Sequence, residues 1–110
     1  MEKYSSALDG VFVALADPTR RAVIRRLGQG PASVGDLAGE APMTLPSFMK
    51  HVRMLESSGL ISTSKAGRVR TCELNRNRFG LINDWLGDQK AIWRERTDRL
   101  EQFVTKEDKS

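Results

Sequence analysis

Residues 34–74 read VGDLAGEAPMTLPSFMKHVRMLESSGLISTSKAGRVRTCEL, and this stretch predicts a short helix, a tight turn and a longer helix. Ser33 stands before the first helical pattern and Thr44 before the second, and both residue types cap free N–H groups at helix starts. Gly59 is placed to end the second helix in the left-handed conformation that glycine adopts readily. The stretch therefore predicts two consecutive helices with defined ends.

A hairpin is expected to follow these helices. Residues 60–65 and 69–74 contain β-compatible side chains on either side of Ala66-Gly67, which we expect to form the turn. The alternation of two arginines with Val69 would place both on one face of the hairpin. Such a cationic tip can reach DNA phosphates or a narrow minor groove, or it can simply protect an exposed strand edge from pairing. The basic side chains concerned are Lys65, Arg68 and Arg70.

The second helix, residues 45–58, separates apolar from polar side chains. Phe48, Val52 and Leu55 follow the spacing of a buried face, and rotation by about 100° per residue then points Pro46, Lys50 and Arg53 outward, with Leu45, Ser47 and Met49 near the edge. A cationic helix followed by a cationic hairpin is typical of a winged helix-turn-helix, whose second helix enters the DNA major groove. The candidate DNA-binding residues are Thr44, Leu45, Pro46, Ser47, Met49, Lys50, His51, Arg53, Lys65, Arg68 and Arg70.

Two of these residues have a second interpretation. Met49 can contact a thymine methyl group or fill a gap between helices. His51 lies at the border of the buried face, where it can contact a base or take a structural role by bridging to the backbone or packing under the hairpin. A thymine contact is also open to Leu45, whereas Lys50 and Arg53 can bind guanine edges or phosphates.

Two helices are predicted before this region. The first covers residues 8–15, and the second begins at Pro18 after the cap Asp17 and ends near Gly28. The second helix carries a run of basic side chains that can anchor phosphates or form a solvated face. These are Arg20, Arg21, Arg25 and Arg26.

A long amphipathic helix is predicted over residues 78–104. Its apolar stripe, with Phe79 near the start and Val104 at the end, is too long for one small domain to cover, and large apolar patches seldom stay uncovered. We therefore expect an interface with a second copy, the alternative being that the helix folds back on its own core. The expected interface residues are Leu8, Phe12, Trp85, Ile92, Trp93 and Leu100.

The chain length sets the domain organisation. At 110 residues we expect a single winged-helix domain, 1–110, mainly α-helical with a small β-hairpin, with a core over 8–77, a hairpin at about 60–74 and a dimerisation helix at 78–104. The net charge is +4, and residues 45–78 contain seven basic side chains against two acidic ones. A basic excess confined to one segment is the footprint of a polyanion-binding surface, although charge alone equally fits a solvated surface.

The residue inventory argues against several other classes. With one cysteine, Cys72, and one histidine, His51, no disulfide or four-ligand zinc site is expected within the chain. No phosphate-cradling glycine motif or nucleophile elbow is present, so we expect neither an enzyme nor a cofactor. No membrane span is expected, and residues 1–6 carry Glu2 and Lys3 rather than a secretory pattern, so the expected location is cytoplasmic.

Three stretches resemble the ArsR/SmtB-type winged-helix transcriptional regulators. They are LADPTRR at 15–21, MTLPSFMKHVRMLESSGLI at 43–61 and GRVR at 67–70. The resemblance implies a homodimeric repressor that binds double-stranded DNA at an inverted repeat, often that of its own operon, and that leaves DNA when an inducer binds. It implies DNA contacts for four side chains of the second helix and backbone contacts for two arginines. These are Leu45, Pro46, Met49 and Lys50, and then Arg68 and Arg70.

This chain departs from the family pattern at several positions. Many relatives have polar residues where this chain has Leu45 and Met49. The family's metal sensors place cysteines where this chain has Ser33 and Gly35, or histidines on the last helix, where none follows His51. The chain therefore resembles the metal-independent branch, with its inducer left open.

Two rival functions remain open from the sequence. A protein-interaction adaptor would use the Trp85/Trp93 stripe for a different partner. A redox sensor would use Cys72 as its switch, whereas a cysteine buried in a strand is more often a small apolar side chain of the core.

Overall fold

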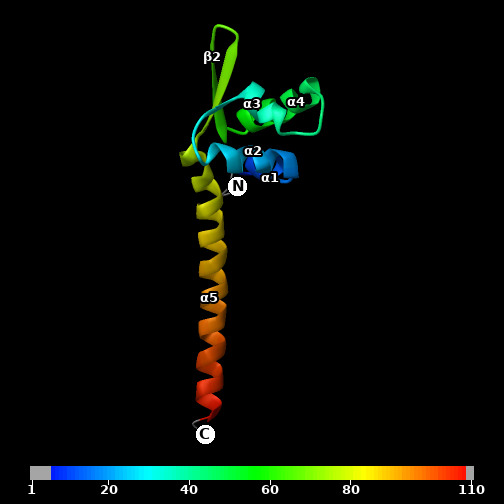
Figure 1. The fold of residues 1–110 in the computed structure, drawn as a ribbon. Helices are drawn as coiled ribbons and strands as arrows, with labels where there is room; N and C mark the ends of the chain where they lie inside the picture. The colour runs from blue at the N-terminus through cyan, green and yellow to red at the C-terminus, as the bar shows by residue number, and fades with distance from the viewer. Residues whose placement is uncertain (1–5, 109–110) are drawn as a thin grey trace. The chain divides into compact units, whose positions relative to one another are not determined.

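The chain folds into two compact units. The computed structural model describes residues 6–108, with side chains up to residue 103. The first unit is Met1–Gly80 and the second is Leu81–Ser110. Glu2, Lys3 and the side chain of Val104, on which the sequence analysis touched, lie outside the described part. Figure 1 shows the ribbon, in which the long helix α5 makes up the second unit.

The first unit contains four α-helices and three strands among its described residues. In chain order the elements are α1 Ser6–Leu15, α2 Pro18–Leu27, β1 Ala32–Ser33, α3 Val34–Gly39, α4 Leu45–Ser57, β2 Ile61–Ala66, β3 Val69–Leu74 and a 3₁₀ turn Arg76–Phe79, followed by α5 Gly80–Asp108. In Figure 1 the β2–β3 hairpin extends beyond the helices of this unit. A mainly helical fold with a small sheet is thereby confirmed.

Three helices start at the caps that the sequence predicts. The Asp17 side chain accepts a hydrogen bond from the Arg20 amide at 3.1 Å, with Pro18 in the first turn of α2. Ser33 accepts from the Asp36 amide at 3.0 Å at the start of α3. Thr44 accepts from the Ser47 amide at 3.3 Å at the start of α4. Each side chain supplies an acceptor for a backbone N–H that has no partner within its helix.

The end of α4 also follows the prediction. Gly59 has φ +83, a left-handed conformation that costs a non-glycine residue about 1–2 kcal/mol. Its amide donates to the carbonyl of Glu56 at 3.0 Å. Directly after this turn the chain enters β2, so the glycine sets the direction in which the hairpin leaves the helix.

The sheet differs from the prediction in two ways. It has three antiparallel strands in the order β1-β3-β2, with Ala32 paired to Cys72. A two-residue strand such as β1 has no detectable periodicity, which is why the sequence predicts only a hairpin. The turn is also one residue later than predicted, because Ala66 pairs with Val69 and leaves Gly67-Arg68 as the turn.

All buried apolar side chains of the described residues lie in the first unit. The predicted inward face of α4 is confirmed, since Phe48, Val52 and Leu55 are each no more than 1% exposed. The complete set is Leu8, Val11, Ala14, Val23, Leu27, Ala32, Val34, Leu37, Phe48, Val52, Leu55, Leu60, Ile61 and Cys72. This core fixes the rotation of α4 about its axis.

The helix boundaries shift slightly at both ends of the chain. The first helix begins at Ser6, two residues earlier than expected, and α5 begins at Gly80 after a 3₁₀ turn rather than at residue 78. In the described part, no helix is both long and apolar enough to span a bilayer.

Candidate nucleic-acid interface

The outer face of α4 presents cationic and apolar side chains together. Lys50, Arg53, Pro46 and Ser47 are exposed, while Met49 is half-buried. Leu45 is 56% exposed, which agrees with its predicted place near the edge of the outward face. It occupies the first turn of α4, three residues before the first core contact at Phe48.

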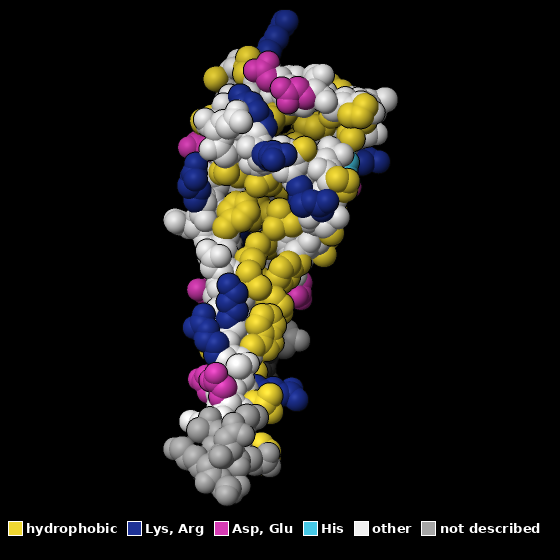
Figure 2. All heavy atoms as spheres, turned by 60° about the horizontal axis from the view of Figure 1, so that its bottom comes forward, with side chains coloured by type: hydrophobic (Ala, Val, Ile, Leu, Met, Phe, Trp, Pro, Cys, Tyr) yellow, Lys and Arg dark blue, Asp and Glu magenta, His cyan; other side chains and the backbone are white. Residues whose placement is uncertain are grey.

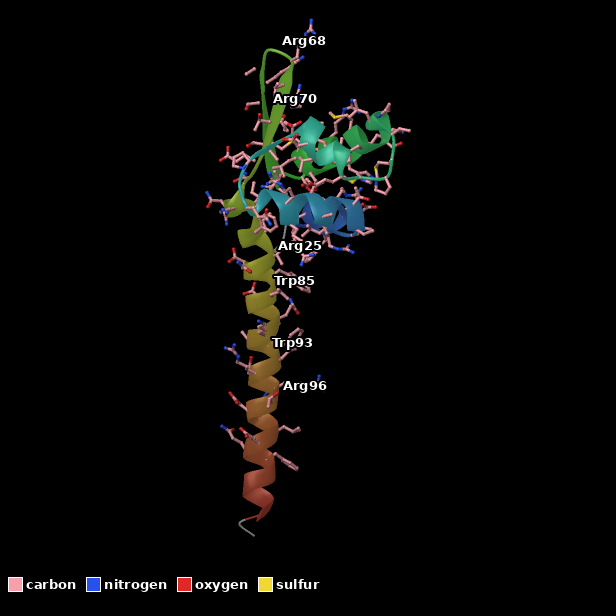
Figure 3. The ribbon with its side chains drawn as sticks, viewed as in Figure 1. Arg25, Arg68, Arg70, Trp85, Trp93 and Arg96 are labelled. Carbon is pink, nitrogen blue, oxygen red and sulfur yellow. The ribbon has the colours of Figure 1, made fainter. Side chains whose placement is uncertain are left out.

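The hairpin provides a second cationic surface. Lys65 and Arg68 are exposed, and Figure 3 shows Arg68 at the tip. Arg68 lies in the turn rather than in a strand, so strand alternation does not set its direction, although Arg68 and Arg70 both line the groove described below. The tip charge is thus carried by Arg68, and Arg70 lies further down the strand (Figure 3).

Arg70 is held by the protein rather than left in solvent. Its guanidinium donates to the hydroxyl of Thr63 at 2.9 Å, and that hydroxyl donates to the Glu56 carboxylate at 2.5 Å. These hydrogen bonds connect β3, β2 and α4. Sequence reasoning missed this connection because it depends on the cross-strand register.

A groove of about 410 Å³ separates the hairpin from the start of α4. Leu45 and Met49 form its α4 side, and basic side chains form its hairpin side. The hairpin side includes Lys65, Arg68 and Arg70. An open groove with one cationic and one apolar wall suits a sugar-phosphate strand, which needs positive charge along one side.

The arginine run of α2 is mainly structural. Arg20 donates to the carbonyls of Ala14 at 2.7 Å and Val13 at 3.1 Å, and Arg21 donates to the carbonyl of Leu15 at 2.8 Å. These carbonyls lie at the C-terminal end of α1, where no intrahelical partners remain. The sequence left open whether this run anchors phosphates or forms a solvated face. Arg20 and Arg21 do something else in the structure, because they cap the C-terminus of α1.

The other two arginines of the run differ from each other. Arg26 donates to the carbonyl of Gly30 at 3.2 Å. Arg25 is exposed, and Figure 3 shows it on the side of α2 away from the hairpin. Neither side chain shares a surface with the α4 groove.

His51 lies where α4 meets the start of α2. Its Nδ1 atom is 3.0 Å from a terminal nitrogen of Arg20 and 3.7 Å from a carboxylate oxygen of Asp17. These contacts join α4 to α2 through side chains, rather than to the backbone or the hairpin as the structural alternative had it, and the base contact stays a prediction. Burial raises the pKa of Asp17, but the Arg20 amide and the charges of His51 and Arg20 outweigh this effect and hold that pKa below its usual value.

The end of α4 is fixed by Arg78, which the sequence analysis counted only as a positive charge. Its Nε donates to the carbonyl of Ser58 at 2.9 Å. The guanidinium passes so close to Gly59 that a Cβ there would be 2.7 Å from Nε. Arg78 thus satisfies a free carbonyl at the C-terminus of α4 and needs glycine beneath it.

Cys72 is a core side chain. It is fully buried in the central strand, and burial raises the pKa of its thiol. Reactive cysteines need the opposite, an accessible thiolate with a lowered pKa. The geometry therefore supports the core interpretation over the redox sensor.

The predicted interface residues divide by exposure. Leu8 is only 4% exposed and offers little area to another chain, whereas Phe12 is 39% exposed. On α5, Trp85 is half-buried, and Ile92 and Trp93 are each 56% exposed. Leu100 and Phe103 continue the stripe at 66% and 60% exposure, and Figure 2 shows hydrophobic side chains along α5.

No cluster of three or more histidine, cysteine or acidic side chains suited to a metal ion occurs in the described part of the chain. The surface described above therefore consists of three parts: the outer face of α4, whose rotation is fixed by the core, the basic hairpin, and the groove between them. Together they define a winged helix-turn-helix DNA-binding unit.

Comparison with known proteins agrees with this class. A helix-turn-helix domain family matches residues 15–63. The HTH-type transcriptional regulator Rv2034 of Mycobacterium tuberculosis is 39% identical over 75 residues, or 68% of this chain and 69% of the relative. The transcriptional repressor SdpR of Bacillus subtilis is 32% identical over 68 residues, or 62% of this chain and 76% of the relative.

Solved structures identify the family. The crystal structure of an ArsR family transcriptional regulator has a TM-score of 0.81 and 52% identity, covering 86% of this chain and 97% of that one. An ArsR-like regulator from Rhodococcus sp. RHA1 has a TM-score of 0.76 and 28% identity, covering 89% and 92%. The chain belongs to the ArsR family of winged helix-turn-helix transcriptional regulators, which are DNA-binding proteins rather than enzymes.

Proposed function

We propose that this protein is a homodimeric repressor that binds an inverted-repeat operator, regulates its own operon and leaves DNA when an inducer binds. The observation that carries this proposal is the outer surface of the first unit. Lys50 and Arg53 are exposed on α4, and Lys65 and Arg68 are exposed on the hairpin beside it. One helix can then enter the major groove while the hairpin contacts the flanking backbone.

Base recognition would combine charge with apolar contact. Lys50 and Arg53 can donate to guanine edges or phosphates, while Leu45 can only contact a thymine methyl group or exclude water. Since Leu45 is 56% exposed at the leading end of α4, we expect thymine to be preferred at one operator position. The Thr44 cap, which accepts from the Ser47 amide, holds this leading turn in shape.

Dimerisation is supported by the stripe on α5. All side chains from residue 90 to residue 103 are exposed, and four of them are large and apolar. They are Ile92, Trp93, Leu100 and Phe103. A second copy of α5 is the partner we propose, and a two-fold dimer would present two α4 helices to half-sites about 34 Å apart.

Repression, rather than activation, follows from relatives. SdpR, which is 32% identical, is a transcriptional repressor. A DNA-binding domain of this kind represses most simply by occupying its operator. Release would then require an inducer, whose identity we leave open.

A DNA-binding titration tests the proposal. Fluorescence anisotropy would compare a fragment from upstream of the protein's own gene with unrelated DNA of equal length, each at two salt concentrations. We expect tighter binding to the upstream fragment, at two chains per duplex, and a steep loss of affinity with salt. Equal affinity for both DNAs would remove sequence specificity, and no affinity for either would favour the adaptor function.

A further inference from the structure

Arg20 connects three helices of the first unit. It belongs to α2, its Nε and one terminal nitrogen donate to α1 carbonyls, and its other terminal nitrogen reaches His51 on α4 at 3.0 Å. The guanidinium is thus fixed at two of its three nitrogens by the end of α1. It therefore approaches α4 as a preformed donor.

The chemistry of the pair fixes the protonation state of His51. Arginine only donates hydrogen bonds, so Nδ1 of His51 must be the acceptor, and the imidazole proton must be on Nε2. A protonated imidazole carries hydrogens on both nitrogens and cannot accept from Arg20. It can instead turn its Nδ1 hydrogen towards the Asp17 carboxylate, 3.7 Å away.

Two charged side chains, Arg20 and Asp17, determine how the His51 ring is held. Asp17 and Arg20 are the charged side chains of α2 and its cap that face His51. Asp9 on α1, Lys65 on β2, and Lys50, Arg53 and Glu56 on α4 make no hydrogen bond or ion pair with the ring in the described part of the chain. The neutral ring therefore pairs with Arg20, and the protonated ring pairs with Asp17.

We propose that Arg20 and His51 are positioning residues for DNA recognition: neutral His51 accepts from Arg20 and holds α4 in the orientation that reads the operator, and protonation releases this hold. The proposal rests on α4 being the DNA-reading helix. His51 is one position from Lys50 and two from Arg53, so a change in its hold on α2 alters the direction of both outward side chains.

Two substitutions separate positioning from charge. His51→Leu removes the acceptor and keeps the bulk, while His51→Asn places an amide oxygen where Nδ1 stands and cannot titrate. Anisotropy with the upstream fragment and with unrelated DNA gives the ratio of the two affinities at pH 7.5 and at pH 5.5. The ratio matters because a proton on His51 adds positive charge, which tightens binding to both DNAs alike.

The expected results differ among the three proteins. At pH 7.5 His51→Leu lowers the affinity ratio about tenfold or more, the effect of losing one hydrogen bond to a charged group, whereas His51→Asn keeps it. At pH 5.5 the wild-type ratio falls by about the same factor, and neither variant changes with pH. Thermal unfolding of each variant confirms that the comparison concerns folded protein.

Arg25 supplies a matched control for Arg20. Arg20→Gln and Arg25→Gln remove the same charge from the same helix, but Arg25 is exposed on the side of α2 away from the hairpin (Figure 3). Only Arg20→Gln should lower the ratio. If the wild type prefers the upstream fragment but His51→Leu has the same affinity ratio at both pH values, the role of His51 is overturned and the proposed function is not. A wild type without any preference would overturn the proposed function as well.

Discussion

At the scale of the residue, the glycine that follows α4 is required for two independent reasons. Gly59 has φ +83, and a Cβ at this position would be 2.7 Å from Nε of Arg78. Gly67 in the hairpin turn has φ +62, but a Cβ there would meet nothing within 4 Å. The sequence marks both positions as turns. Only the structure shows that both glycines have a positive φ and that Gly59 alone also lacks room for a Cβ.

Alanine at these two positions should therefore have unequal effects on stability. Gly67→Ala should lower the free energy of unfolding by about 1–2 kcal/mol, the cost of a left-handed residue. Gly59→Ala should cost more, about 2–4 kcal/mol, because Arg78 must also move and lose its hydrogen bond to Ser58. Urea denaturation measures both values, and equal losses would show that Arg78 adjusts freely.

The cap of α2 gives a prediction with a defined pH dependence. Asp17→Ala should destabilise the protein by about 1 kcal/mol at neutral pH. Because folding lowers the pKa of Asp17, its charge contributes stability above the ordinary carboxylate value of about 3.9, and this contribution is lost as pH falls through the lowered folded value. The gap between wild type and variant should thus be constant above about pH 5 and narrow below about pH 4.

Asp17→Asn is the control for this titration, since asparagine also caps helices and carries no charge. It should keep most of the neutral-pH stability. A gap between wild type and Asp17→Ala that stays constant down to about pH 2 would show that the carboxylate charge is irrelevant.

At the scale of the element, the helix α4 and the hairpin meet DNA in different ways. The buried face of α4 fixes which of its side chains point outward, whereas the hairpin is connected to α4 by the hydrogen bonds through Thr63. Arg70 takes part in those bonds, and Arg68 does not. The two arginines, which resemblance alone treats alike, should therefore behave differently on substitution.

Arg68→Ala should remove one phosphate contact. We expect weaker binding to all DNA sequences by about the same factor and a salt dependence whose slope is smaller by about one. Titrations at several salt concentrations, with Arg25→Ala as the matched loss of charge, provide the measurement. An unchanged salt dependence would show that Arg68 contacts no phosphate and favour the alternative, in which its charge protects the exposed strand edge from pairing.

At the scale of the whole molecule, the two units have different kinds of surface. The first unit contains the whole described core, while α5 contributes none of it and exposes Ile92, Trp93, Leu100 and Phe103. A helix of 29 residues with such a stripe is not expected to be stable without a partner for its apolar face. The proposed partner is a second copy of the chain.

Trp93→Glu should accordingly disrupt the dimer. A buried charge without a partner opposes association, so light scattering should show a shift from dimer to monomer at micromolar concentration. Affinity for the upstream fragment should fall at least tenfold, because a monomer binds only one half-site. Glu95→Lys, on an exposed and polar part of α5, should keep the mass of the dimer, and an unchanged mass for Trp93→Glu would place the interface elsewhere.

The sequence by itself determined the helices, their caps and the orientation of α4. These features depend on local chemistry, namely the caps Asp17, Ser33 and Thr44, the turn at Gly59 and the period of Phe48, Val52 and Leu55. Short-range rules of this kind are readable because each residue acts on neighbours within four positions of it.

Only the tertiary structure decided the third strand, the turn at Gly67-Arg68 and the roles of the polar side chains that join elements. Arg20 and His51 are 31 positions apart, and Arg78 and Ser58 are 20 apart. No periodicity connects residues at such separations, since their meeting depends on how helices and strands pack. For that reason an arginine that the sequence shows only as positive charge is, in the folded protein, a cap of α1 and a donor to the helix proposed to read DNA.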